Sequence, residues 1–272
     1  MKTLRQRLLS VVRPGPVVSV LRLYGAIGLG GPLGRGIDDE SLAPLIERAF
    51  APRRLKAVAL AINSPGGSPA QSALIAARIR RLADERAVKV HAFCEDVAAS
   101  GGYWLACAAD QIWAEANAIV GSIGVVSASF GFQDAIARLG VERRVHTAGE
   151  RKTLLDPFRP EDPADVERLK RIQKGVHDNF IAHVERARGD RLTGDRAALF
   201  SGDVWLAAEA QELGLIDGVG HLAPTMRRLY GEDVRFAVAR PRKSLLQRLG
   251  APGAAELLGA VEERALFARY GR

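Results

Sequence analysis

The sequence predicts an α/β fold with a mostly parallel sheet and a helical C-terminal part. The first observation is the run LKAVALAIN, residues 55–63, which is short and almost continuously apolar, as is typical of a parallel strand covered on both faces. The second is that apolar runs of strand length alternate with segments of helical period. The third is a charged segment from about residue 161 whose apolar residues recur with a helical period.

The first expected strand is VVSVLRL, residues 17–23, and a glycine-rich loop follows it. From Gly28 this loop fails the dinucleotide-binding pattern G-x-G-x-x-G, because Leu33 occupies the sixth position and a proline interrupts the run. We interpret it as a flexible loop. The next expected elements are a helix at 41–50, the strand 55–63, a helix at about 70–83, a strand at 88–94, a helix after Ser100 and two short strands within 111–128.

A long helix is expected to begin at Asp162 and Pro163, and two shorter helices are expected within residues 192–220. We divide the chain into three parts. These are a basic amphipathic N-terminal segment (1–16), a main domain (17–222) and a basic, helical C-terminal extension (223–272). The terminal segments are expected to contact a membrane or a partner subunit, or to pack on their own domain.

Composition limits the function classes. The chain has 272 residues, 47% of them hydrophobic, and a formal net charge of +8 that is spread along its length. No nucleic-acid recognition motif accompanies this charge, so no nucleic-acid partner is expected. No window approaches ~18 consecutive apolar residues, the signal of a membrane-spanning helix. Cys94 and Cys107 form no metal or disulfide pattern and are expected to be buried thiols. A cytoplasmic location is therefore predicted, with contact to the inner face of a membrane as an option.

The stretch EDVAASGGYW, residues 95–104, places Ser100 between an apolar run and two glycines. One interpretation is that Ser100 only caps the helix that follows it. The other is that Ser100 is a nucleophile on a tight strand-to-helix turn. Acyl transfer also needs donors for the oxyanion, and the N–H groups of the glycines in NSPGGSP and of Gly101 could provide them.

Four motifs carry a resemblance to a known family: INSPGGSP, VAASGGYW, VGSIGVV and TAGERKTLLDPFRP. In these motifs the chain resembles the SppA-type signal peptide peptidases, and more distantly the Clp protease subunit and the crotonases, over residues 17–220. The resemblance implies a spiral fold of ββα units of the Clp and crotonase type. It implies that Ser100 is the nucleophile and that Lys152, which stands 52 residues later, is the general base. It further implies that Ser122 orients the lysine amine, and that Gly67 and Gly101 supply the oxyanion-hole N–H groups, with no cofactor.

The resemblance therefore predicts an ATP-independent serine endopeptidase with a Ser-Lys dyad, acting on unstructured or apolar peptides such as signal peptide remnants or membrane protein fragments. It also implies a homo-oligomer, a ring or dome, because neighbouring subunits in the family help to close the site. Two alternatives stay open, a crotonase-like acyl-CoA enzyme and a catalytically silent membrane-associated scaffold. A Ser-His-Asp triad would need one of the five histidines, and we assign none of them a role.

Overall fold

The computed structural model describes residues 15–28, 36–149, 152–240 and 264–271. They fall into two compact units, unit 1 (Met1–Ile123 and Ile181–Arg272) and unit 2 (Gly124–Phe180). Most of the expected N-terminal segment, the middle of the glycine-rich loop and residues 241–263 of the expected C-terminal extension lie outside the described residues. Among the described residues, no helix is both long and apolar enough to cross a membrane.

Unit 1 is built on one eight-stranded sheet whose path is β6-β5-β3-β2-β1-β8, with β4 pairing β3 and β7 pairing β4. All strand pairs are parallel except β5 with β6, so the predicted sheet type is confirmed. The strands are β1 (Val17–Tyr24), β2 (Leu55–Ser64), β3 (Lys89–Ala99), β4 (Gln111–Ala114), β5 (Ile119–Gly121), β6 (Val204–Leu206), β7 (Gly218–Val219) and β8 (Arg235–Val238).

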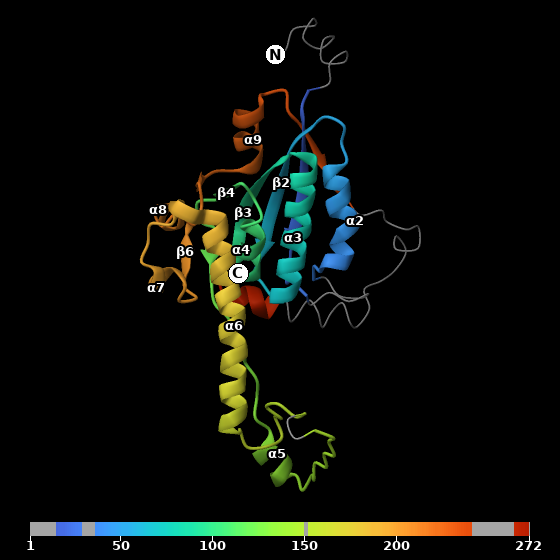
Figure 1. Cartoon of the computed structure of the whole chain (residues 1–272), viewed down its shortest axis with the longest axis vertical. Helices are drawn as coiled ribbons and strands as arrows, with labels where there is room; N and C mark the ends of the chain where they lie inside the picture. The colour runs from blue at the N-terminus through green and yellow to red at the C-terminus, as the bar shows by residue number, and fades with distance from the viewer. Residues whose placement is uncertain (1–14, 29–35, 150–151, 241–263, 272) are drawn as a thin grey trace, which may run out of the picture. The chain divides into compact units, whose positions relative to one another are not determined.

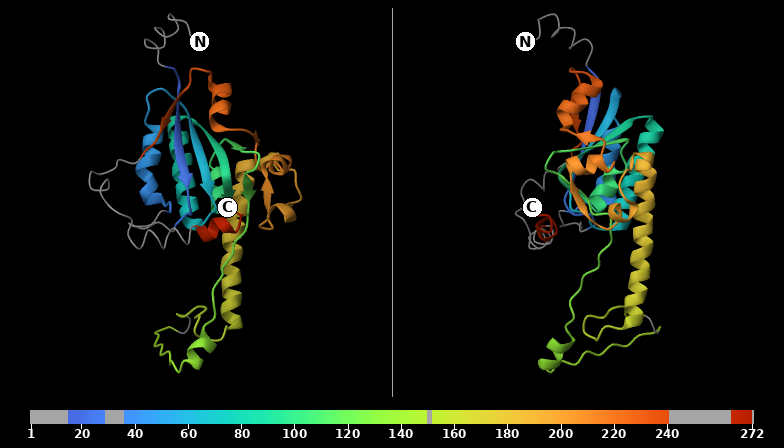
Figure 2. Two further views of the ribbon diagram at one scale, coloured as in Figure 1. Left: turned by 180° about the vertical axis from the view of Figure 1, so that it is seen from behind. Right: turned by 90° about the vertical axis from the view of Figure 1, so that its left-hand side faces the viewer.

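Helices cover the sheet of unit 1 on both faces, and Figure 2 shows α3 and α9 on opposite sides of it. Figure 1 shows α2 and α3 lying side by side over the central strands. The helices of unit 1 are α2 (Asp39–Phe50), α3 (Pro69–Arg86), α4 (Gly101–Ala106), α7 (Arg196–Leu199), α8 (Ala207–Glu212) and α9 (Leu222–Tyr230), with a 3-10 turn at Gly189–Arg191. This double cover explains why β2 is apolar at almost every position.

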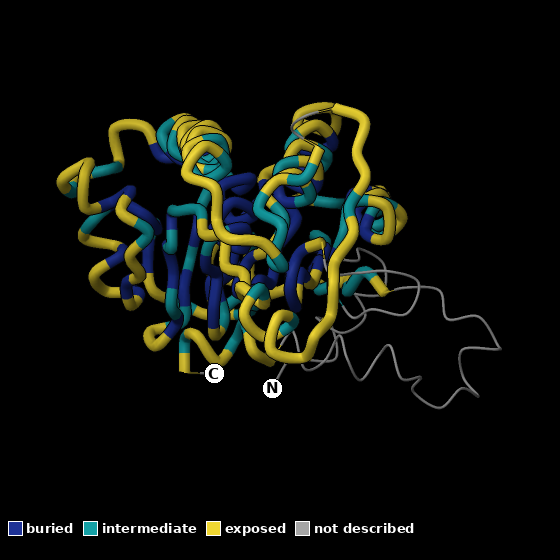
Figure 3. Tube along the Cα trace, turned by 90° about the horizontal axis from the view of Figure 1, so that it is seen from below, coloured by how far each residue is buried: buried dark blue, intermediate teal, exposed yellow. Residues whose placement is uncertain are grey.

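The core follows from the alternation of side chains along the strands. Val18 and Val20 of β1 pack with the alanines of β2 and with Met226 of α9. Leu21 and Leu23 of β1 are buried as well. Figure 3 shows this buried backbone gathered in the strands while the outer sides of the helices are exposed. The ends of β1, β2 and β3 are thereby fixed relative to one another, which matters for the loops that follow them.

Unit 2 contains α5 (Gln133–Arg138) and the first part of α6 (Pro163–Arg188), which continues into unit 1. The Asp162 carboxylate accepts a hydrogen bond from the Ala164 N–H at 2.9 Å, as the predicted helix start requires. Several large apolar side chains of this unit are exposed, among them Phe130 at 78% and Leu139 at 77%. Single exposed apolar residues are common on protein surfaces, but several of them in one small unit are unusual.

Three of the strands were not predicted from the sequence. β6 and β7 are two or three residues long, too short for an alternating pattern to be recognised. β8 lies where only helices were expected, and it pairs with β1 from Val17↔Arg235 to Val20↔Val238. An edge strand of four residues owes its conformation to the neighbouring strand, which no local sequence pattern reveals.

A buried ion pair fixes the C-terminal end of α6 to the sheet. Arg188 is 2% exposed and donates to both carboxylate oxygens of Asp217, at 2.7 and 3.2 Å, and to Gly214 O at 2.8 Å. Asp217 also accepts from the N–H of Ile112 in β4 at 2.7 Å. Burial alone would raise the pKa of Asp217, but the hydrogen bonds from Arg188 and Ile112 outweigh it and lower the pKa.

We expect Asp217→Asn to lower the free energy of unfolding by about 3–5 kcal/mol, because it leaves the Arg188 guanidinium buried without a counter-charge. The matched control is Glu85→Gln, which removes a carboxylate from an exposed pair with Arg81 and should cost less than about 1 kcal/mol. Urea unfolding of both variants measures the difference.

The same pair gives the stability a defined pH dependence. A carboxylate whose pKa is lowered by folding stabilises the protein above its unfolded pKa, and the contribution is lost as the pH falls through the folded pKa. The stability gap between the wild type and Asp217→Asn should therefore shrink in acid. An equal gap at about pH 7 and about pH 2 would contradict this account.

Candidate active site

Ser100 lies between the last residue of β3 and the first residue of α4, in a strained backbone conformation with φ +52° and ψ −120°. Such angles are rare for a residue with a side chain and cost about 1–3 kcal/mol, so the surroundings must impose them. The Ser100 side chain makes no capping hydrogen bond to α4. The interpretation of Ser100 as a helix cap alone is therefore wrong, and its half-buried hydroxyl is left for another use.

The second serine, Ser122, follows the strand beside β3. β3 and β5 are paired in parallel with Ala99 opposite Gly121, so Ser100 and Ser122 each come one residue after a paired position. The Ser100 N–H donates to Gly121 O at 2.8 Å, and the Ser122 N–H donates to Asp203 O at 2.6 Å. Ser122 also has a positive φ of +52°. The structure thus places Ser100 and Ser122 at the ends of neighbouring strands.

The turn after β2 lies so close to the Ser100 turn that no side chain fits between them at Gly66. A Cβ atom built on Gly66 would lie 2.8 Å from both the Gly101 nitrogen and the Ser100 Cβ, and 2.9 Å from Ala99 O. Gly66 also has a φ of +99°. Only glycine meets both conditions, so this contact explains the first glycine of the NSPGG motif.

The peptide group that Gly67 shares with Gly66 constrains the direction of the Gly67 N–H. The Ile27 N–H donates to Gly66 O at 2.8 Å, and the two groups of a trans peptide point in opposite directions. The Gly67 N–H therefore points away from Ile27. The Gly101 N–H opens the first turn of α4, where helical N–H groups lack a partner within the helix. Neither N–H has an acceptor among the described residues.

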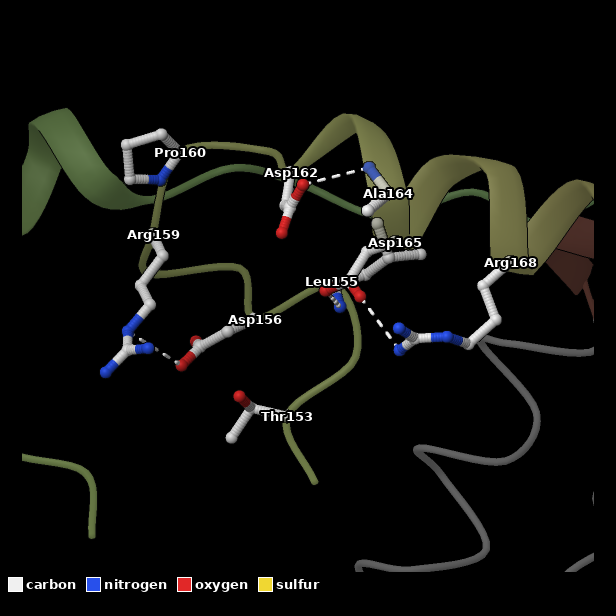
Figure 4. Close-up of a pocket in the computed structure, with 9 residues that line it drawn as sticks. All are labelled: Thr153, Leu155, Asp156, Arg159, Pro160, Asp162, Ala164, Asp165 and Arg168. Carbon is white, nitrogen blue, oxygen red and sulfur yellow. Dashed lines mark hydrogen bonds and ion pairs between the residues drawn. The ribbon is translucent and has the colours of Figure 1, made fainter. Parts of the chain in front are cut away.

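Lys152 belongs to unit 2, whereas Ser100, Ser122, Gly67 and Gly101 belong to unit 1. Its side chain is exposed, and its N–H donates to Gly149 O at 3.2 Å. The chain after Lys152 lines a cavity of about 490 Å³, whose wall includes Thr153, Leu155, Asp156, Arg159, Pro160, Asp162, Ala164, Asp165 and Arg168 (Figure 4). All of these residues lie in unit 2, and their charges are largely paired.

Two aspartates hold the chain after Lys152 in shape. The Asp156 side chain is 5% exposed and accepts hydrogen bonds from the Arg143 guanidinium at 3.0 Å and from the Phe158 N–H at 3.1 Å. Asp165, in the first turn of α6, accepts from the Leu155 N–H at 3.2 Å, where Leu155 has a φ of +48°. The chain that follows the predicted base is thus anchored at Leu155 and Asp156 by hydrogen bonds to charged groups.

The sequence analysis gave Arg143 and Asp165 no role, and no local signal distinguishes them from the many other charged residues of the chain. Arg143 contacts its partner from 13 positions away, and its guanidinium also lies 4.8 Å from the centre of the Phe158 ring. Only the folded unit brings these groups together. Asp156 could have been noted, because it belongs to the DPF motif that carries the resemblance.

Two histidines near the sheet have structural partners. His91 bonds to the Tyr230 hydroxyl at 2.8 Å and His183 to Trp104 O at 3.0 Å, and burial lowers the pKa of both rings. Cys94 and Cys107 are buried, as predicted, and burial raises the pKa of each thiol. Across the described ranges, no three His, Cys, Asp or Glu residues are grouped so that they could hold a metal ion.

Comparisons with known proteins cover most of the chain. The model of Peptidase family S49 matches residues 83–233, a range that includes Ser100, Ser122 and Lys152. The chloroplastic serine protease SPPA of Arabidopsis thaliana is 32% identical over 214 residues, which are 76% of this chain and 31% of that protein. A Brucella melitensis protein named Na⁺/H⁺ antiporter NhaA is 48% identical over 271 residues, which are 93% of this chain and 37% of that protein.

The chain spans about a third of the length of these two relatives, so each name describes a protein longer than the part that matches. Among solved structures, the membrane-bound stomatin-specific protease 1510-N, a mutant in complex with a substrate peptide, has a TM-score of 0.52 at 15% identity. The match covers 87% of this chain and 96% of that one. The expected fold, of the Clp and crotonase type, is confirmed.

We expect Gly66→Ala to destabilise unit 1 by about 1–3 kcal/mol, because the new Cβ would meet backbone atoms of the Ser100 turn and the φ of Gly66 is positive. Gly175 provides the matched control. It lies within α6, a Cβ there meets nothing within 4 Å, and Gly175→Ala should stabilise the helix by about 1 kcal/mol. Thermal unfolding compares the two. Equal effects of the two substitutions would contradict the close approach of the turns.

Proposed function

Because the chain belongs to peptidase family S49, as its SppA-like motifs predict, we propose that it is an ATP-independent serine endopeptidase in which Ser100 and Lys152 form the catalytic dyad. The observation that carries the proposal is the Ser100 turn. Its backbone is strained, and its hydroxyl is not used to cap α4. The N–H of Gly101, the next residue, and the N–H of Gly67, on the adjoining turn after β2, have no acceptor among the described residues. Strain and unused donors on two adjoining turns are typical of a catalytic site.

In the proposed reaction, Ser100 Oγ attacks the carbonyl carbon of the scissile peptide bond while Lys152 Nζ takes the hydroxyl proton. The carbonyl oxygen becomes negatively charged and accepts hydrogen bonds from the Gly67 and Gly101 N–H groups, with the amino end of α4 adding favourable charge. The lysine then passes the proton to the leaving amine. Water hydrolyses the resulting ester by the same route, with Lys152 again as the base and Ser122 orienting its amine.

The substrates we propose are unstructured, apolar peptides, such as signal peptide remnants or fragments of membrane proteins. A peptide must be extended to reach a serine that lies at the ends of parallel strands, between two glycine turns. The name of the Arabidopsis relative, serine protease SPPA, supports a peptidase, and the solved protein of similar fold is called membrane-bound. We therefore propose a cytoplasmic protein with contact to the inner face of the membrane.

We further propose that the active form is a homo-oligomer, a ring or dome. A lysine acts as a base only in its neutral form, and burial away from water favours that form. In the single chain, however, the Lys152 side chain is exposed to solvent. The exposed apolar residues of unit 2, such as Phe130, Leu139 and Val141, are the surface that a neighbouring subunit would bury. Such burial would cover the loop region of unit 2 and complete the site.

Ser100→Ala should abolish peptide hydrolysis and labelling by a fluorophosphonate, because both need the nucleophilic hydroxyl. The variant should remain folded, within about 1 kcal/mol of the wild type, since the hydroxyl makes no capping bond. Mass spectrometry of the labelled protein identifies the modified residue. Hydrolysis by the purified variant would exclude Ser100 as nucleophile, and a folded wild type that neither labels nor hydrolyses peptides would favour the crotonase-like or scaffold alternatives.

Lys152→Arg should lower the turnover number by about 10²–10⁴-fold, because a guanidinium cannot accept the serine proton at any accessible pH. Lys170→Arg is the matched control, since Lys170 is an exposed lysine of unit 2 whose amine pairs with Glu167 at 3.2 Å. Steady-state rates on a fluorogenic peptide give the comparison. Turnover by Lys152→Arg equal to that of Lys170→Arg would assign the base to another residue.

A further inference from the structure

Ser64, the last residue of β2, is a buried serine that the proposed mechanism does not use. Its exposure is 0%, and its hydroxyl makes two hydrogen bonds. The hydroxyl donates to Gly25 O at 2.6 Å and accepts from the Gly66 N–H at 3.2 Å. One side chain thus connects the residue that follows β1 to the glycine turn that follows β2.

Ser64 also lies against the first turn of α4. A Cβ built on Gly102 would be 2.5 Å from Ser64 O and 3.2 Å from the Ser64 Cβ. Gly66, two residues after Ser64, is in contact with Ser100 and Gly101 on the same side of the turn. Ser64 therefore touches both segments that carry the proposed oxyanion donors.

The glycine turn needs such an anchor, because two consecutive glycines leave the backbone with more conformations than any other pair. Gly66 has a φ of +99° and Gly67 a φ of +144°. Ile27 holds the carbonyl of Gly66, and the Ser68 N–H donates to Ile27 O at 2.8 Å. The Gly66 N–H is the remaining donor of the turn, and the Ser64 hydroxyl accepts its hydrogen bond. A buried donor that loses its partner is destabilising.

We propose that Ser64 is a positioning residue for the oxyanion hole: its hydroxyl fixes the Gly66 N–H, and thereby the direction of the Gly67 N–H relative to Ser100. This inference rests on the proposed function of Ser100. Together, Ser64 and Ile27 hold the peptide groups on both sides of Gly66. Without the Ser64 hydroxyl the turn keeps only the Ile27 anchor, and the Gly67 N–H samples directions that do not face the oxyanion.

The test compares Ser64→Ala with Ser19→Ala, a matched removal of a hydroxyl from a β1 residue that is 1% exposed. Because the oxyanion forms only in the transition state, Ser64→Ala should lower kcat on a fluorogenic apolar peptide by about 10–100-fold and change KM by less than about threefold. Ser19→Ala should leave both unchanged. Ser64→Thr, which keeps the hydroxyl, should recover part of kcat when it folds.

Circular dichroism gives the folded fraction of each variant, and kcat is expressed per folded molecule. If the kcat per folded molecule of Ser64→Ala equalled that of the wild type, the proposal would be overturned, because the hydroxyl would then be needed only for stability. An equal loss of kcat in Ser64→Ala and Ser19→Ala would overturn it as well.

Amide hydrogen exchange, read by mass spectrometry, tests the anchor without relying on catalysis. Ser64→Ala should speed exchange in the peptide that contains Gly66 and Gly67 by at least about tenfold, whereas Ser19→Ala should not. Unchanged exchange there would refute the anchor even if activity fell. If the wild type failed to label at Ser100 while exchange still responded to Ser64→Ala, the proposed nucleophile would be wrong and the anchor right, so the two failures are distinguishable.

Discussion

The rest of the site depends on the close approach of two backbone turns, in which Gly66 lies against Ser100 and Gly101 with no room for a side chain. The parallel pairing of β2, β3 and β5 brings these turns to the same edge of the sheet. The Ser100 N–H, bonded to Gly121 O, holds the strained conformation from the other side. The strained Ser100 turn, two N–H groups without an acceptor among the described residues and a second serine on the neighbouring strand are thus all consequences of strand register combined with a glycine at position 66.

The loop that carries Lys152 is held by a different kind of interaction. In unit 1 the turns are fixed by backbone packing, but in unit 2 the chain after Lys152 is fixed by Asp156 and Asp165, whose carboxylates bind Arg143, Arg168 and the loop's own N–H groups. Charge-assisted hydrogen bonds suit a unit that has few buried apolar residues. The exposed apolar surface of unit 2 and the exposed amine of Lys152 fit a base whose surroundings are completed by a neighbouring subunit, as we propose.

Apolar patterns were enough to locate most of the fold. Three predictions are confirmed: the continuous apolar run of β2, the helical period of α6 and the start of that helix at Asp162 and Pro163. A strand buried on both faces needs apolar residues at nearly every position, and a helix buried on one side needs them at a helical period, so both patterns can be recognised in the sequence. The sequence pattern did not reveal strand β8, because its four residues are exposed or half-buried and its pairing with β1 supplies its hydrogen bonds. Family S49 membership was likewise predicted from short glycine and serine motifs, and the family match confirms it.

The sequence alone determined the α/β fold, the family and the positions of Ser100, Lys152, Ser122, Gly67 and Gly101 as candidates. It could not decide whether Ser100 caps the helix that follows it, because serine is a preferred residue before a helix; the backbone angles of Ser100 and its missing cap bond exclude that role. Nor could it distinguish Ser64 from any other buried serine, or Arg143 from any other arginine. Their importance comes from partners 39 and 13 positions away, and only the packed chain brings such partners within hydrogen-bonding distance.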